Sequence, residues 1–227
     1  RYKGQVINWE TDVRKSVAEN PNTSTELQSD LLKQLASYEG TFLVRGYVAE
    51  LSTTPVELLQ QLAKDEDGYV RSIVAKNSNT PVKELRQLAR DEDENVRLYS
   101  AENPNTPLED IQLLFMDESS TVRSAVARNP NMPGDVLQKM AGDKEHLVRM
   151  WISTNSNTPT HVLTQLASDG NSTVRESVAY NSNTPVEVLR QLSEDEESNV
   201  RQCVALNPNA SAELRLKLLR QLIREEH

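Results

Sequence analysis

The sequence predicts an all-α solenoid, a fold in which short helical repeats stack one after another. A Val-Arg dipeptide recurs through the chain, and from Val44 onward each copy follows the last by 26 residues. The copies begin at Val13, Val44, Val70, Val96, Val122, Val148, Val174 and Val200. A fixed period between about 20 and 50 residues is typical of solenoids. We therefore expect about eight two-helix repeats of 26 residues, with an irregular first repeat because its step is 31.

Each repeat contains two groups of apolar residues at helical spacing, which predict a first helix (helix A) and a second helix (helix B). In the repeat from Val174 these residues are Val174, Val178 and Ala179, then Val186, Leu189 and Leu192. Helix A, at about eight residues, is too short to be stable alone, and we expect it to be partly tightened into a 3₁₀ helix. Ordering the 26 residues of a repeat costs about 1–2 kcal/mol for each residue. Its six buried apolar side chains return only about 1.5–3 kcal/mol each, so a repeat needs its neighbours to fold.

The linker "NSNTP" between the two helices predicts how helix B begins. Thr184 is expected to cap the helix, Pro185 to occupy its first turn, and Glu187 to complete a capping box. The same box is expected at Thr23 with Glu26, Thr54 with Glu57, and Thr106 with Glu109.

The pattern VRxxVAxNPNTPxxxLxxLAxD, nearly intact from Val70 to Asp91 and from Val174 to Asp195, resembles the leucine-rich repeat variant family. The resemblance spans all eight repeats and implies a right-handed α-solenoid in which a brief helix alternates with a longer one. It implies no particular function. Some relatives carry a cysteine cluster for an iron–sulfur centre, but Cys203 is the single cysteine here, so no cofactor is expected. An Asp followed by Val-Arg is reminiscent of HEAT repeats, which makes a HEAT-like helical pair the nearest alternative geometry.

Composition narrows the classes of function. The net charge of −9 and a pI near 5.0 oppose nucleic-acid binding, which needs clustered, unpaired Lys and Arg. No apolar run approaches 18 residues, so we expect no membrane span, and a single cysteine favours a reducing compartment such as the cytoplasm. The histidines His146, His161 and His227 lack metal-ligand spacing, no glycine loop could hold a phosphate, and no motif supports an enzyme.

We expect three segments along the chain. Residues 1–12 form a lead-in, residues 13–217 form the repeat array, and residues 218–227 end a capping helix whose leucines lie at helical spacing. Because the chain opens at Arg1 without methionine, we expect it to be a fragment whose N-terminal cap is partly missing.

Three polar series recur with the repeat. The arginines are Arg14, Arg45, Arg71, Arg97, Arg123, Arg149, Arg175 and Arg201. The aspartates are Asp65, Asp91, Asp117, Asp143, Asp169 and Asp195, and the linker asparagines are Asn20, Asn77, Asn103, Asn129, Asn155, Asn181 and Asn207. The arginines could form a phosphate-binding stripe, but acidic partners in step with them favour an Arg–Asp ladder between loops and helices. The asparagines are expected to satisfy buried backbone groups of the linkers. Most linkers have a second asparagine two residues after the first. Leu51 and Thr53 stand at these two positions in the second linker, so we expect that linker to be held less firmly.

Positions that vary between repeats are the candidates for partner binding. The third and seventh residues of each repeat should project away from the core, and the fourth should lie at its margin. The candidates are Leu98, Tyr99, Glu102, Ser124, Arg128, Met150, Trp151, Thr154 and Tyr180. Tyr99 and Trp151 can instead pack between repeats, and Leu113 with Met116 forms a second candidate patch on helix B.

Cys203 is expected to be a small buried hydrophobe. The sequence thus predicts a non-catalytic scaffold for a protein or peptide partner, and the alternative is a nucleic-acid-binding solenoid.

Overall fold

The computed structural model describes residues 16–17, 20, 22–37 and 41–225, and within them helices are joined by short turns and linkers. Fifteen helices, α2 to α16, occur in this part of the chain, and no strand does. The chain divides into two compact units, Arg1–Pro107 and Leu108–His227. The predicted all-α repeat fold is confirmed.

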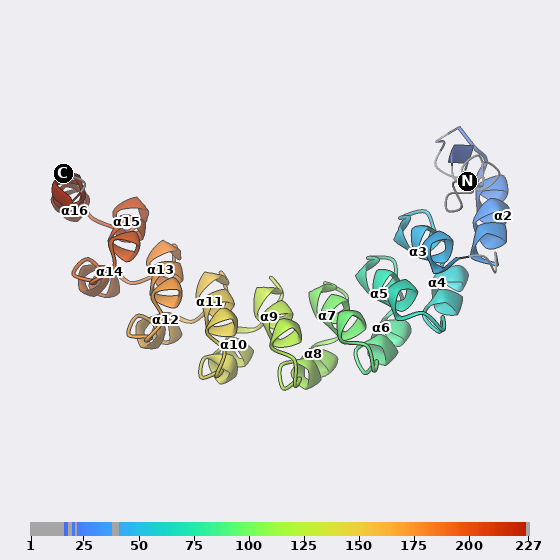
Figure 1. Cartoon of the computed structure of the whole chain (residues 1–227), viewed down its shortest axis with the longest axis horizontal. Helices are drawn as coiled ribbons and strands as arrows, with labels where there is room; N and C mark the ends of the chain where they lie inside the picture. The colour runs from blue at the N-terminus through green and yellow to red at the C-terminus, as the bar shows by residue number, and fades with distance from the viewer. Residues whose placement is uncertain (1–15, 18–19, 21, 38–40, 226–227) are drawn as a thin grey trace, which may run out of the picture. The chain divides into compact units, whose positions relative to one another are not determined.

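From Thr25 onward the N-terminal unit holds three A helices and three B helices. The A helices are α3 (Phe42–Glu50), α5 (Gly68–Lys76) and α7 (Glu94–Glu102), and the B helices are α2 (Thr25–Ala36), α4 (Val56–Leu62) and α6 (Val82–Leu88). Helix α5 packs between α3 and α7, and within this unit the A helices form one row and the B helices another (Figure 1).

The C-terminal unit repeats this arrangement. Its A helices are α9 (Ser120–Arg128), α11 (His146–Thr154), α13 (Ser172–Tyr180) and α15 (Ser198–Leu206). Its B helices are α8 (Leu108–Leu114), α10 (Gly134–Met140), α12 (Thr160–Leu166), α14 (Val186–Leu192) and the longer α16 (Ala212–Glu225). Each A helix packs on the next, and α16 packs on α15. The expected boundary at residue 218 falls inside α16, which is continuous, while the expected lead-in of residues 1–12 lies outside the described residues.

The core is distributed along the repeats rather than gathered in one place. The valine of the Val-Arg pair is fully buried at Val70, Val96, Val122, Val148, Val174 and Val200. Helix B contributes a completely buried leucine at Leu59, Leu85, Leu137, Leu163 and Leu189, and α8 has the almost completely buried Ile111 in this place. Because each helix pair is flanked by neighbours, its apolar residues are buried by other repeats, which is why no single repeat could fold alone.

The lengths of the helices differ from expectation. Helix A is an α-helix of nine residues in every described repeat from α3 to α15, and helix B between them has seven. The expected 3₁₀ tightening is therefore wrong. From α3 onward helix A is the longer of each pair, except that α15 is shorter than the 14-residue α16.

The expected capping box is also wrong. Proline itself occupies the N-cap of helix B, as at Pro185, and makes no side-chain cap. The preceding threonine lies one residue too early to cap, and the Thr184 hydroxyl instead donates to the Val178 carbonyl of helix A at 2.6 Å. Thr54, Thr80, Thr106 and Thr158 do the same. Thr23 donates to Val17, and Ser24 is the N-cap of α2. The threonine thus closes the turn between two helices by satisfying the last carbonyls of the first.

Candidate partner-binding surface

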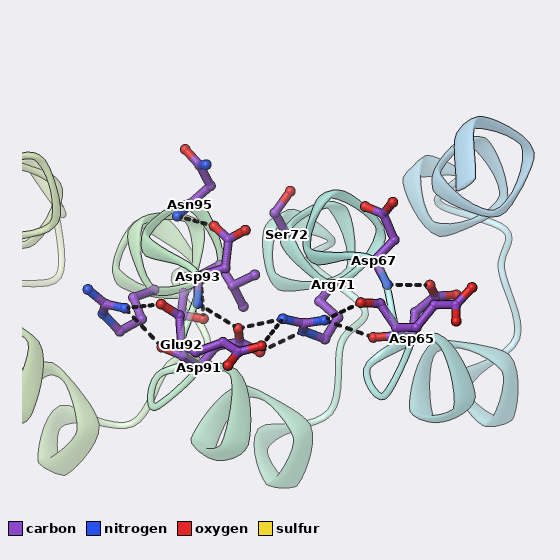
Figure 2. Close-up of polar contacts among 12 residues, drawn as sticks. Asp65, Asp67, Arg71, Ser72, Asp91, Glu92, Asp93 and Asn95 are labelled. Carbon is purple, nitrogen blue, oxygen red and sulfur yellow. Dashed lines mark hydrogen bonds and ion pairs between the residues drawn. The ribbon is translucent and has the colours of Figure 1, made fainter. Parts of the chain in front are cut away.

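The recurrent arginines are committed to contacts within the array. Arg71 of α5 donates through Nε and Nη2 to the two carboxylate oxygens of Asp91, at 2.7 and 2.8 Å, while Nη1 donates to the Asp65 carbonyl at 2.9 Å. Figure 2 shows Arg71 lying between Asp65 and Asp91. Asp65 is in the loop before α5, and Asp91 is in the loop after α6. Asp91 also accepts from the N–H of Asp93, the N-cap of the next helix A.

The same bidentate pair recurs along both units. It joins Arg45 to Asp65, Arg123 to Asp143, Arg149 to Asp169, and Arg175 to Asp195. These side chains are mostly buried, so their donors are not presented to a ligand. The predicted Arg–Asp ladder is confirmed, and the alternative of a phosphate-binding stripe is wrong for these arginines. Arg14 lies outside the described residues.

The ladder lowers the pKa of its carboxylates. Burial alone would raise the pKa of Asp169, but hydrogen bonds from Arg149 and from the N–H of Asn171 outweigh it, so the pKa lies below its ordinary value. The pKa values of Asp65, Asp91 and Asp143 are lowered by the same balance, and for Asp195 the hydrogen bond from Arg175 is the largest influence.

We expect acid to destabilise the protein through this ladder. A carboxylate whose pKa falls on folding stabilises the fold above the unfolded pKa of about 4, and this stability is lost as the pH falls through the lower folded pKa. The urea midpoint should therefore drop between pH 7 and pH 3, and Asp169→Asn should reduce the drop. Equal wild-type midpoints at the two pH values would contradict this role of the ladder.

The linker asparagines form a second, buried series. Asn181 donates through Nδ2 to the carbonyls of Ser153 and Asn155, at 2.7 and 3.2 Å, and its Oδ1 accepts from the Asn183 N–H at 2.8 Å. Asn77, Asn103, Asn155 and Asn207 make the equivalent bonds to the preceding repeat. The predicted structural role is confirmed for these five asparagines, which removes their amides from the candidate binding groups, whereas Asn20 is exposed and its Oδ1 accepts from the Asn22 N–H. Leu51 cannot donate such a bond, although its carbonyl accepts from Asn77.

With these series assigned to the scaffold, the exposed ends of the A helices remain. Among seventh positions, Arg128, Thr154 and Tyr180 are exposed, Tyr180 by 68%, while Glu102 is half-buried. The third positions Leu98, Ser124 and Met150 and the fourth positions Tyr99 and Trp151 are half-buried. The third positions, which were expected to project away from the core, are thus only partly exposed, because A helices flanked by others expose only a narrow strip. Tyr99 packs against the core of the N-terminal unit, as the packing alternative expected.

Two hollows lie beside this strip in the C-terminal unit. The first, of about 300 Å³, is lined by Arg128, Pro130, Trp151, Thr154, Asn155 and Ser156. The second, of about 320 Å³, is lined by Thr154, Ser156, Tyr180, Asn181, Ser182, Leu206 and Pro208. The Arg128 guanidinium lies over the Trp151 ring, 5.0 Å from its centroid, which fixes one wall of the first hollow. We call the side chains Arg128, Trp151, Thr154, Tyr180 and Leu206, with these two hollows, the A-helix strip.

Leu206 was missed by sequence reasoning. It is 74% exposed at the end of α15, and the seventh-position rule applied to the last repeat would have found it. The N-terminal unit has a smaller hollow of about 220 Å³ in the equivalent place, lined by Glu50, Ser52, Ile73, Lys76, Asn77 and Ser78. There the Lys76 Nζ lies 5.7 Å from the centroid of the Tyr99 ring. As with Arg128 and Trp151, a cation lies over the aromatic residue of the next repeat.

The remaining candidates lie elsewhere. Leu113 and Met116 are 48% and 76% exposed, so they form an exposed helix B patch as the sequence suggested. Cys203 is half-buried, and burial together with the charge of Glu176 raises the pKa of its thiol, which lowers its reactivity. Within the described residues no three His, Cys, Asp or Glu side chains gather as metal ligands. Nor does any helix in that part of the chain have the length and apolar content to cross a bilayer.

Comparison with known proteins agrees with the repeat geometry. The family model "Leucine rich repeat variant" matches residues 121–145 and 173–197. A solved leucine-rich repeat variant with a novel repetitive structural motif is 24% identical, with a TM-score of 0.63 over 89% of this chain and 87% of that one. The Escherichia coli protein YibA is 17% identical, with a TM-score of 0.55 over 98% of this chain and 93% of its own. No curated protein matches the chain by sequence. Two segments of the chain thus match the leucine-rich repeat variant model, and its helical repeat fold is similar to that of a solved protein of this kind.

Proposed function

We propose that this protein is a non-catalytic scaffold that binds a protein or peptide segment along the A-helix strip of its C-terminal unit. The observation that carries the proposal is the pair Tyr180 and Leu206, two large side chains that are 68% and 74% exposed on the wall of one hollow. Neither side chain is needed to fill the core. Exposed aromatic and aliphatic groups beside a hollow are the usual anchors of a protein interface.

The polar surroundings of the strip suit a peptide. Ser156 and Ser182 are exposed in the linker loops that border the second hollow, and their hydroxyl groups can bond to a peptide backbone. Trp151 borders the neighbouring hollow and can pack against an apolar side chain of the ligand. The strip therefore combines apolar anchors with polar groups at its edge, which is the composition of a protein-binding surface.

Nucleic acid suits this surface less well. Phosphate binding requires unpaired cations, but the recurrent arginines donate to aspartates and loop carbonyls, and the net charge is −9. A salt-dependent affinity for short oligonucleotides would favour that alternative.

The proposal predicts that Tyr180→Ala with Leu206→Ala weakens peptide binding at least tenfold, because truncating central anchors typically costs on the order of 2 kcal/mol or more. Peptides enriched from a random display library on the wild-type chain would be titrated by fluorescence anisotropy. Leu113→Ala with Met116→Ala is the matched control, since it removes two exposed apolar side chains from α8 and the turn that follows it. If the Leu113→Ala, Met116→Ala variant loses affinity while the Tyr180→Ala, Leu206→Ala variant keeps it, the peptide binds at the helix B patch and not at the A-helix strip.

A further inference from the structure

A larger groove lies at the last two B helices, away from the A-helix strip. It has a volume of about 910 Å³ and lies between α14 and α16. The lining residues are Arg190, Ser211, Glu213, Leu214, Leu216, Lys217, Arg220, Gln221 and Arg224. Since α16 packs on α15, the groove occupies the side of α16 that faces α14.

The groove is basic on a chain that is acidic overall. Four of its lining residues are cations and one, Glu213, is a carboxylate, whereas the whole chain has a net charge of −9. Lys217 forms an ion pair with Glu194. Arg190, Arg220 and Arg224 have no ion pair with any residue in the described part of the chain, so their charge is available to a ligand.

An exposed apolar strip borders this basic groove. Leu216, Leu219 and Ile223 are 50%, 52% and 59% exposed. Their spacing of three and four residues places them on one side of α16, next to Arg220 and Arg224. Leu218, in contrast, is fully buried, so α16 is held to the array through another side of the helix. The three exposed residues are thus not required for its attachment.

We propose that the groove and its apolar strip bind an acidic amphipathic helix of a partner protein. The apolar side of that helix would cover Leu216, Leu219 and Ile223, and its Asp and Glu side chains would pair with Arg190, Arg220 and Arg224. Amphipathic helices bind to apolar grooves in this way, and charge complementarity selects the partner and its orientation. This inference goes beyond the proposed function, because the surface and the ligand chemistry are both different.

A second copy of this chain suits the groove less well. Two α16 helices laid against each other would bring together Arg220 and Arg224 from both copies, and like charges across an interface are unfavourable. The unpaired arginines therefore favour an acidic partner.

The test uses the full chain and two synthetic helical peptides. Both carry leucine at positions i, i+3 and i+7, but one has glutamate and the other lysine at the flanking positions. By fluorescence anisotropy the glutamate peptide should bind at least tenfold more tightly than the lysine peptide. Arg220→Glu with Arg224→Glu should reverse this preference, whereas Lys64→Glu with Lys83→Glu, at two exposed positions of the N-terminal unit, should leave it unchanged. Leu219→Ser with Ile223→Ser should weaken the glutamate peptide at least tenfold while the helical circular dichroism stays that of wild type.

Three results would overturn the inference. The first is equal affinity for the two peptides, and the second is binding to phosphatidylserine vesicles without binding to the glutamate peptide. The third is a concentration-dependent dimer in sedimentation that Arg220→Glu with Arg224→Glu abolishes. Tyr180→Ala with Leu206→Ala should leave binding of the glutamate peptide intact, so the groove and the A-helix strip are tested separately.

Discussion

Replacing Arg149 by alanine should lower the free energy of unfolding by about 3–5 kcal/mol, the cost of removing one partner from a buried ion pair. Asp169 would remain mostly buried without the two donors that now lie at 2.6 and 2.9 Å from its oxygens. The carbonyls of Asp143 and Lys144 would lose the same guanidinium. Asp143→Ala should act similarly, because it strands Arg123. Urea unfolding followed by circular dichroism measures the effect.

Two further variants show whether geometry or charge matters at this position. Arg149→Lys keeps the charge but loses the bidentate fork, so its loss of stability should fall between those of Arg149→Ala and wild type. Lys64→Ala, at an exposed position, should change stability by no more than about 0.5 kcal/mol. If Arg149→Ala unfolds at the wild-type urea concentration, the ladder does not stabilise the array.

Replacing Asn181 by alanine should cost about 2–4 kcal/mol, because the Ser153 carbonyl and the Asn183 N–H lose their bonds to the amide and the Asn155 carbonyl keeps only that from the Thr158 N–H. The amide joins consecutive linkers, so its loss loosens α13 from the helix pair before it. Asn183→Ala is the matched control. Its side chain makes one bond, to the Ser156 carbonyl, at an exposed site, and its loss should cost less than about 1 kcal/mol. Equal urea midpoints for the two variants would show that burial of the amide is not what matters.

The repeated part of the structure could be predicted from sequence because every repeat has the same geometry, so a residue that recurs at one position has the same role in each copy. The arginines and aspartates recur in step, which predicted that they pair but left open whether an aspartate binds the arginine of its own or of the next repeat. The structure pairs Arg149 with Asp169, 20 residues later. The asparagines could be assigned for the same reason. Thr184 was misassigned because proline can stand at the N-cap or one residue later, and only the backbone distinguishes the two.

The candidate surfaces were less predictable, because exposure depends on neighbours that the periodicity does not describe. Leu98 and Met150 share a third position and were expected to project away from the core, but the flanking A helices half-bury them. The hollow beside Tyr180 also depends on the linker residues Ser182 and Pro208 of successive repeats. The groove at α16 arises where the periodic pattern ends, so no comparison between repeats could show it.

The central claim is that recurrent residues hold the fold while variable, exposed residues bind a partner. The most direct test is the unfolding midpoint of Tyr180→Ala with Leu206→Ala, measured on the same samples that are titrated with a selected peptide. The account predicts a melting temperature within about 2 °C of wild type, since exposed truncations change stability little, together with the loss of peptide affinity. A midpoint lowered as far as that of Arg149→Ala would place Tyr180 and Leu206 in the scaffold and contradict the claim.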